Sequence, residues 1–311
     1  MEGISFAYNW EVSLIEWLQS HMPEGFISFV SRLSIFGEEL VAILVLGFLY
    51  WCLNKQAGKY VGLNLLAASV YNPMVKNCVL RRRPYFDHET INILRPVDKN
   101  ADVYDIVAQG YSFPSGHSTT ASSLFGSIAL YFKKRALTVV ACVLCLLVGF
   151  SRVVVGAHFP TDIICGWLVS AFAIGLISGL RRVIKNENAL RLVLLLTALP
   201  GLFFCKSADY FTCFGLLLGF IASIPVEERF VQFENTRSPI RIALRLVGGL
   251  VIFFAADKLL KLPFDKEFLA SGQYAALLVR AIRYTVISFL EFGVYPMIFK
   301  YTKNIGSKRD K

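Results

Sequence analysis

The sequence predicts an all-α integral membrane protein, a polytopic bundle of helices. Hydrophobic residues make up 55% of its 311 residues and charged residues only 17%, whereas charged residues are about 25% of a typical soluble domain. The apolar residues are gathered in repeated runs, and a helix needs about 20 apolar residues to cross the hydrocarbon core of a bilayer. This composition excludes a disordered chain and argues against an ordinary soluble enzyme.

The chain begins with an amphipathic segment and continues into apolar runs. In residues 8–20, Trp10, Leu14, Ile15 and Leu18 recur at helical spacing, which is typical of a helix that lies in the membrane interface. Membrane spans are predicted near residues 36–53, 58–76, 118–132, 136–154, 160–180, 190–205, 208–225, 241–259 and 281–299. Only residues 81–113 form a long polar connection.

Lysine and arginine are unevenly distributed over the connections between spans. With the N-terminus outside, the inside segments hold 18 of these residues, and the outside segments hold seven, apart from the two loops at 81–113 and 153–159. Because cytoplasmic loops carry an excess of Lys and Arg, the N-terminus is expected outside and the C-terminus in the cytoplasm. This bias also accounts for the net charge of +10 without a nucleic-acid partner.

The seven cysteines lie within or beside apolar runs. Cys142 and Cys145 have no neighbouring Cys or His that would complete a zinc site, and the spacings do not form a disulfide framework. We expect the cysteines to be free and to act as small core residues.

Three polar segments stand out from the apolar background, and the predicted topology places all three at one membrane face. They are Lys76–Pro84, Phe113–Ser118 and Ser151–Asp162. Ionisable residues at membrane depth are costly, so they are candidates for function.

The residue types in these segments are those that bind phosphate. Lys76, Arg83 and Arg152 supply three positive charges, and the planar guanidinium group matches phosphate oxygens. Ser115 and Gly116 open a predicted helix, where free N–H groups and the helix dipole favour an anion. Glycine also allows a ligand to approach the backbone closely.

Two histidines accompany these groups. Pro160 suits the first position of a helix, so His158 is expected just before the helix and Asp162 in its first turn, within reach of the imidazole. A carboxylate in that position orients a catalytic histidine and stabilises its positive charge. With His117 at the start of the other helix, one imidazole could attack phosphorus while the second protonates the leaving alcohol.

Together, the three segments resemble the signature motifs of the type-2 phosphatidic acid phosphatase and haloperoxidase superfamily. Six residues separate Lys76 from Arg83-Pro84, Pro-Ser-Gly-His occupies 114–117, and Ser151-Arg152 precedes His158 and Asp162. The motifs are complete and in order. The resemblance implies a six-helix phosphatase core over residues 36–206, after an amphipathic segment at 1–35. Residues 207–311 would add about three transmembrane helices of unassigned role.

The resemblance also implies roles for individual residues. His158 would be the nucleophile that forms a phosphohistidine, Asp162 its orienting partner and His117 the general acid. The phosphate would be held by Lys76, Arg83, Ser115, Gly116 and Arg152. Membrane members of the family are metal-independent, so neither a metal nor a cofactor is expected. The expected substrate is a lipid phosphate or polyprenyl diphosphate, dephosphorylated at the outer face of a plasma membrane.

Other functions stay open at this point. The phosphohistidine could be passed to an acceptor hydroxyl, as in a phosphotransferase. The substrate could be a soluble sugar phosphate, because glucose-6-phosphatase also resembles this superfamily. A lipid-phosphate binder or transporter would need the cations but not two histidines. Haloperoxidase chemistry is disfavoured because those relatives are soluble.

Two expectations concern residues outside the motifs. Arg81 and Arg82 are expected to extend toward lipid headgroups as helix-end anchors. Glu291 lies inside an apolar run, and we expect it to form a structural ion pair with a nearby charge such as Arg280 or Arg283.

Overall fold

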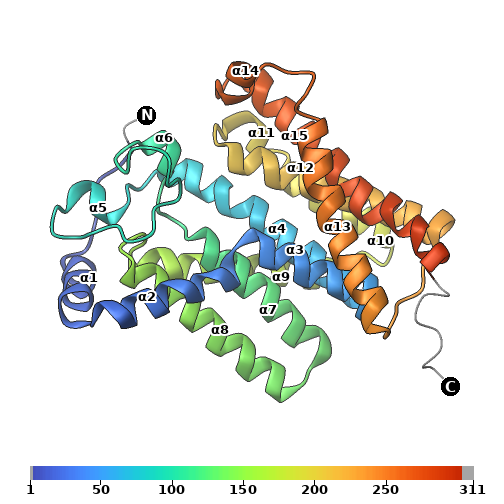
Figure 1. The fold of residues 1–311 in the computed structure, drawn as a ribbon, viewed down its shortest axis with the longest axis horizontal. Helices are drawn as coiled ribbons and strands as arrows, with labels where there is room; N and C mark the ends of the chain where they lie inside the picture. The colour runs from blue at the N-terminus through green and yellow to red at the C-terminus, as the bar shows by residue number, and fades with distance from the viewer. Residues whose placement is uncertain (1–2, 303–311) are drawn as a thin grey trace. The chain divides into compact units, whose positions relative to one another are not determined.

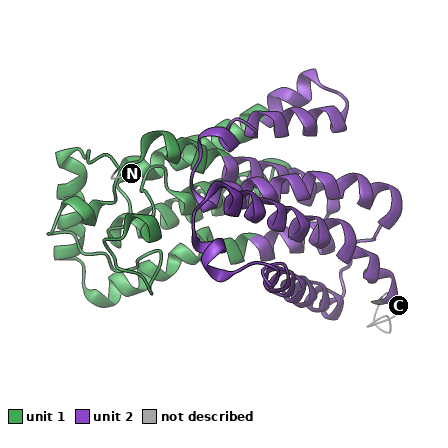
Figure 2. Ribbon diagram, turned by 90° about the horizontal axis from the view of Figure 1, so that it is seen from above, with its two compact units in different colours: residues 1–42, 71–176 green, residues 43–70, 177–311 purple. Residues whose placement is uncertain are grey.

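The computed structural model describes residues 3–302, and all their helices and turns confirm the all-α prediction (Figure 1). No β-strand occurs in this range, apart from a single bridge between Ile4 and Arg81. The chain divides into two compact units (Figure 2): unit 1 is residues 1–42 and 71–176, and unit 2 is residues 43–70 and 177–311. All eight predicted site residues belong to unit 1.

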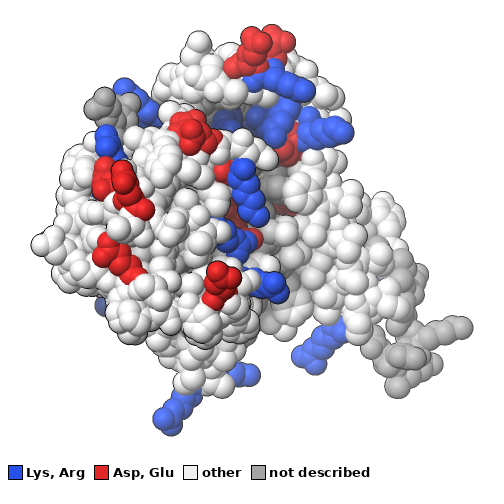
Figure 3. All heavy atoms as spheres, turned by 60° about the vertical axis from the view of Figure 1, so that its left-hand side comes forward, with Lys and Arg blue, Asp and Glu red and all other residues white. Residues whose placement is uncertain are grey.

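The protein is an integral, multi-pass membrane protein. Within residues 3–302, five helices are long and apolar enough to cross a membrane, or six if the bent pair Glu24–Gly37 and Glu39–Leu53 is one span. The five are α8 (Arg135–Val154), α9 (Pro160–Val183), Glu187–Phe204, Ala208–Val231 and α13 (Pro239–Leu259). Figure 3 shows Lys, Arg, Asp and Glu side chains in separate groups on one face, with other residues forming most of the surface between them.

The three other predicted spans are also helical. They correspond to α4 (Lys55–Val79), α7 (Gly116–Phe132) and α15 (Tyr274–Phe289). The polar side chains Asn64, Asn72 and Lys76 interrupt the apolar character of α4. Helices α7 and α15 have 17 and 16 residues, close to the lower limit of about 17 for a span.

Unit 1 is built from the N-terminal helices, the polar connection and the helices that follow it. It contains α1 (Asn9–His21), α2 (Glu24–Arg32), the 3₁₀ helix η1 (Leu33–Gly37), the start of α3 (Glu39–Gly47), the end of α4, α5 (Pro84–Asp87), α6 (Ile106–Gln109), α7, α8 and most of α9. Residues 9–21 of the predicted amphipathic segment form helix α1, in which Ile15 and Leu18 are buried while Trp10 and Trp17 are exposed.

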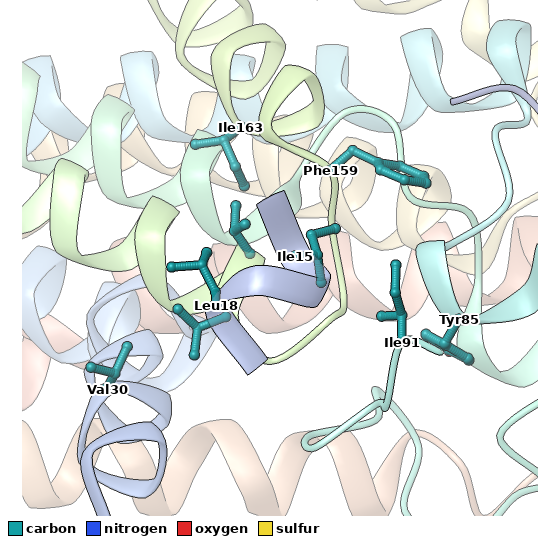
Figure 4. Packing of buried hydrophobic residues seen from close by; sticks show 9 residues of the cluster. Ile15, Leu18, Val30, Tyr85, Ile91, Phe159 and Ile163 are labelled. Atoms are coloured by element: carbon teal, nitrogen blue, oxygen red, sulfur yellow. The ribbon is translucent and has the colours of Figure 1, made fainter. Parts of the chain in front are cut away.

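An apolar cluster fixes α1 and α2 against the end of α8 and the start of α9 (Figure 4). Ile15 and Leu18 of α1 and Val30 of α2 pack in it with Val154 and Ile163. Burying a large aliphatic side chain stabilises a fold by about 1.5–3 kcal/mol. The cluster therefore holds the N-terminal helices beside the segment that carries His158.

Unit 2 contains the rest of α3, most of α4, the end of α9 and the remaining helices. The remaining helices are the π-helix η2 (Phe48–Leu53), α10 (Glu187–Ala198), α11 (Gly201–Phe204), α12 (Ala208–Val226), the π-helix η3 (Glu227–Val231), α13, α14 (Lys266–Ala270), α15, the π-helix η4 (Leu290–Val294) and the 3₁₀ helix η5 (Tyr295–Thr302).

Helices α12 and α15 approach each other closely because small residues line their contact. A Cβ atom on Gly215 or Gly219 would overlap the carbonyl oxygens of Ala281 and Thr285. Two glycines four residues apart allow this backbone approach in transmembrane helix pairs.

Two sequence predictions are wrong. Arg283 pairs with Asp257 at 2.7 Å instead of with Glu291, because two turns of α-helix separate Arg283 from Glu291 by about 12 Å. Glu291 is buried, and its Oε1 has no hydrogen-bond partner among residues 3–302.

The second wrong prediction concerns the burial of the cysteines. All seven are free, as expected, but Cys78 and Cys142 are exposed and are therefore not core residues. Cys142 lies on the spanning helix α8, where an apolar side chain can face lipid.

Replacing Gly219 by alanine is expected to destabilise unit 2. The added methyl group must push α15 away, and overpacking of this kind costs about 1–3 kcal/mol. Thermal unfolding in detergent would show a lower midpoint for Gly219→Ala. The matched control is Gly179→Ala, where nothing lies within 4 Å of the added atom. Equal midpoints for the two variants would contradict this account of the packing.

Candidate active site

The start of α7 is open to a ligand and fixed to α9. The Ser115 hydroxyl accepts a hydrogen bond from the Ser118 N–H (3.3 Å), and the Ser115 N–H donates to the main-chain oxygen of Asp162 (3.0 Å). A Cβ atom on Gly116 would meet nothing within 4 Å. The helix therefore begins at the predicted residue, beside free space into which its first N–H groups can point.

Arg83 and Lys76 are buried and held by main-chain carbonyl oxygens. Arg83 Nε donates to the oxygens of Gln109 and Gly110, both at 3.0 Å, and its Nη1 donates to Ala157 O at 3.0 Å. Lys76 Nζ donates to Tyr111 O at 3.1 Å. These carbonyl oxygens orient the two cations within the candidate site.

Arg152 is the third buried cation and sits in the last turn of α8. It is 2% exposed, and its Nε has no hydrogen-bond partner in the described part of the chain. Leaving a buried charged donor unsatisfied is costly. A bound anion would remove that cost, which makes Arg152 the clearest sign of an anion site.

The loop before α9 aims His158 at these cations. Gly156 has φ +71°, and a Cβ atom there would lie 2.5 Å from Asn92 O, so only glycine fits this turn. His158 Nε2 lies 3.3 Å from Arg83 Nη1. On the other side of the ring, Nδ1 lies 3.4 Å from Asp162 Oδ2, which accepts the Phe159 N–H at 2.8 Å.

Burial lowers the pKa of His158 well below its usual value, and the positive charges of Arg83, Arg152 and Lys76 lower it further. The imidazole is therefore neutral at physiological pH. Because Arg83 Nη1 can only donate, its contact with Nε2 favours a neutral ring that carries its proton on Nδ1 and has a lone pair at Nε2. The Nδ1 atom itself makes no hydrogen bond among the described residues. A neutral ring with a lone pair at Nε2 is the protonation state that a nucleophile needs.

His117 occupies the first turn of α7. Burial lowers its pKa, and so do Arg152, His158 and Arg83. An anion bound among these arginines would offset their charge and favour a proton on His117. The ring can therefore gain the proton of a general acid when the substrate arrives.

The expectation for Arg81 is wrong, because this side chain is completely buried instead of extended toward headgroups. It forms ion pairs with Asp162 (2.8 Å) and Glu11 (2.7 Å). Arg82 does remain half-exposed, and it lies 3.2 Å from Asp87.

Sequence reasoning missed Glu11, which is 0% exposed. A signal was present, since Glu11 lies four residues before Ile15 and seven before Leu18. This spacing puts Glu11 on the buried face of α1. A carboxylate on such a face must find a buried partner.

Among the described residues, no group of three or more His, Cys, Asp or Glu side chains could hold a metal ion. The groups that converge in unit 1 are instead cations, imidazoles and the free end of a helix. This set suits a phosphate bound through Arg and Lys.

Two family descriptions match the chain. Residues 57–185 match the PAP2 superfamily, and residues 211–307 match the PAP2 superfamily phosphatase transmembrane extension. No solved structure matches the chain.

Three named relatives illustrate the similarity. The undecaprenyl-diphosphatase BcrC of Bacillus subtilis is 30% identical over 174 residues, which cover 54% of this chain and 80% of the relative. The undecaprenyl-diphosphatase of Sulfolobus acidocaldarius is 28% identical over 171 residues, covering 54% of this chain and 76% of the relative. The lipid A 1-phosphatase of Rhizobium johnstonii is 46% identical over 61 residues, covering 20% of this chain but only 24% of that protein.

Inorganic phosphate is expected to raise the thermal midpoint of the wild-type protein, because a ligand stabilises the state that binds it. In Arg152→Met the rise should be lost, while the midpoint without phosphate should stay the same or increase, since a buried charge with an unsatisfied Nε has been removed. The half-exposed Arg82→Met is the matched control and should keep the phosphate effect. Arg152→Met with an undiminished rise would argue against the anion site.

Proposed function

The chain belongs to the PAP2 superfamily, and from this premise we propose that it is a metal-independent phosphatase of a membrane lipid phosphate or diphosphate. The observation that carries the proposal is the position of His158. Its neutral ring lies 3.3 Å from Arg83 on one side and 3.4 Å from Asp162 on the other, beside the buried Arg152. The remaining predicted site residues lie in the same compact unit.

In the first step, a phosphate oxygen replaces the His158 nitrogen as the acceptor of the Arg83 N–H. The lone pair on Nε2 then attacks phosphorus, and the bond from phosphorus to the leaving oxygen breaks. His117 donates its proton to that oxygen. Lys76, Arg83, Arg152 and the N–H groups at Ser115 and Gly116 stabilise the negative charge on the transferring group.

In the second step, water attacks the phosphohistidine. His117 takes a proton from that water, the bond between nitrogen and phosphorus breaks, and inorganic phosphate leaves. Asp162 offsets the positive charge on the His158 ring while the intermediate exists. The cycle returns both histidines to their starting states without a further reactant.

The family and two of its named members, which are undecaprenyl-diphosphatases, favour a polyprenyl diphosphate among the possible lipid substrates. We place the phosphatase core at residues 36–206 and the additional transmembrane helices at 207–311. The distribution of Lys and Arg supports an outward-facing site in the plasma membrane, with the N-terminus outside.

Replacing His158 by glutamine is expected to abolish phosphate release, because the nucleophile is lost. The measurement is phosphate release in detergent with EDTA from polyprenyl diphosphate, phosphatidic acid and phosphatidylglycerol phosphate, with a sugar phosphate for comparison. Rates should fall by about 1,000-fold or more, as for other lost nucleophiles. The exposed His21→Gln should keep wild-type activity. Release that required a metal, or that survived His158→Gln, would refute the mechanism.

The pH dependence of kcat/KM should report the ionisation of His158. Because its pKa is lowered, activity should be lost only as the pH falls below 6.5, where the ring takes up a proton. Lys76→Met removes a positive neighbour and therefore raises the pKa of His158, so the acid limb should move to higher pH. Ionisation of the substrate affects the pH profiles of Lys76→Met and Arg82→Met equally, so a difference between these two profiles reports the enzyme alone. If the acid limb of kcat/KM moved to lower pH in Lys76→Met, the assignment of this limb to His158 would be contradicted.

A further inference from the structure

Next to the predicted site residues, Arg81 lies between two carboxylates that belong to distant parts of the chain. Its Nη2 donates to Glu11 Oε2 at 2.7 Å, and its Nη1 donates to Asp162 Oδ1 at 2.8 Å. All three side chains are 0% exposed. The rings of Phe6 and Phe159 lie 4.3 and 3.9 Å from the guanidinium carbon, so water is excluded around the ion pairs.

Glu11 also binds the first turn of α9 directly. Its Oε1 accepts hydrogen bonds from the N–H of Thr161 at 3.0 Å and from the Thr161 hydroxyl at 2.6 Å. Both carboxylate oxygens of Glu11 are therefore engaged, one by Thr161 and one by Arg81. The residue that follows Thr161 is Asp162, whose other oxygen faces His158.

We propose that Glu11, acting through Arg81, is a positioning residue that keeps Asp162 oriented and negatively charged toward His158. The inference rests on the phosphatase function proposed above. Arg81 alone would neutralise Asp162. With Glu11 present, two carboxylates share one guanidinium, and a net charge of −1 remains to stabilise the positive ring of the phosphohistidine.

A second contact of α1 supports this dependence on the N-terminal helix. The Gln19 amide nitrogen donates to Asn92 O at 2.8 Å and to Val154 O at 3.0 Å. Asn92 O also lies against Gly156, in the loop that aims His158. Helix α1 thus binds both the loop before the nucleophile and the carboxylate behind it.

The test compares Glu11→Gln with Glu16→Gln, the same change on the same helix but at a partly exposed position. In Glu11→Gln, kcat should fall by about 10- to 100-fold, the range for residues that orient a ligating or reacting group. KM should be unchanged, because no residue that holds phosphate has been altered. Glu11→Asp keeps the charge and should recover part of the lost kcat.

A pH profile separates this role from a general structural one. The charged or titratable groups that face His158 are Lys76 on α4, Arg83 after it, His117 on α7, Arg152 on α8 and Asp162 on α9. Glu11→Gln adds no group to this set but removes the negative charge that balances Arg81. The pKa of His158 should therefore fall further, and the acid limb of kcat/KM should move to lower pH.

Binding of orthovanadate gives a readout that does not need turnover, because vanadium accepts a bond from an imidazole nitrogen and adopts the geometry of the transferring phosphate. Calorimetry should show vanadate affinity reduced by about 10-fold in Glu11→Gln, the lower end of the same range, with phosphate affinity unchanged. If Glu11→Gln fails to fold, Arg81→Lys replaces it, with Arg82→Lys as its control. Lysine keeps the positive charge but replaces the planar guanidinium fork by a compact ammonium group, so kcat and vanadate affinity should fall while the acid limb stays in place.

Equal kcat, pH profile and vanadate affinity in Glu11→Gln and Glu16→Gln would overturn the inference. In the experiment with the replacement variants, equal kcat and vanadate affinity in Arg81→Lys and Arg82→Lys would also overturn the inference. A wild-type protein that releases phosphate from no lipid would instead refute the proposed function. The vanadate comparison would still decide whether Glu11 acts on His158.

Discussion

The structure of unit 1 depends on keeping several positive charges buried and hydrogen-bonded. A buried charge is costly unless hydrogen bonds and opposite charges compensate it. For Arg83 and Lys76, main-chain carbonyl oxygens supply hydrogen bonds. The segment around residues 109–111 and the turn at Ala157 must therefore hold their carbonyl groups in fixed positions, which explains why a long polar connection is ordered against the helices.

The three consecutive arginines at 81–83 show how backbone geometry assigns different roles to identical side chains. Arg81 is paired with two carboxylates, Arg82 is half-exposed and Arg83 faces His158. The backbone here is extended and pairs with Ile4, whose N–H donates to Leu80 O and whose carbonyl accepts the Arg82 N–H. Side chains alternate in an extended chain, so Arg81 and Arg83 turn inward while Arg82 turns out.

This arrangement also explains how far the sequence could predict the molecule. Apolar runs, Ser115 before a helix and Pro160 at the start of another are local signals, and α7 and α9 begin where those signals predict. The burial of Arg81 depends on Glu11, 70 residues away. No local pattern specifies such a partner, although the position of Glu11 on the buried face of α1 indicated that one must exist. Arg283 likewise pairs with a residue on another helix, Asp257, which its position before Glu291 in the sequence did not indicate.

The contrast between Arg81 and Arg152 separates two uses of a buried cation. Arg81 has its charge more than balanced by Glu11 and Asp162, so it gains little from a further anion and serves to fix the carboxylates. Arg152 has an Nε without a hydrogen-bond partner among the described residues, so it has a donor left for an anion. Helix α1 supplies one carboxylate of the network around Arg81, so in the proposed mechanism the chemistry at His158 depends on a helix that lies far from the motifs in sequence.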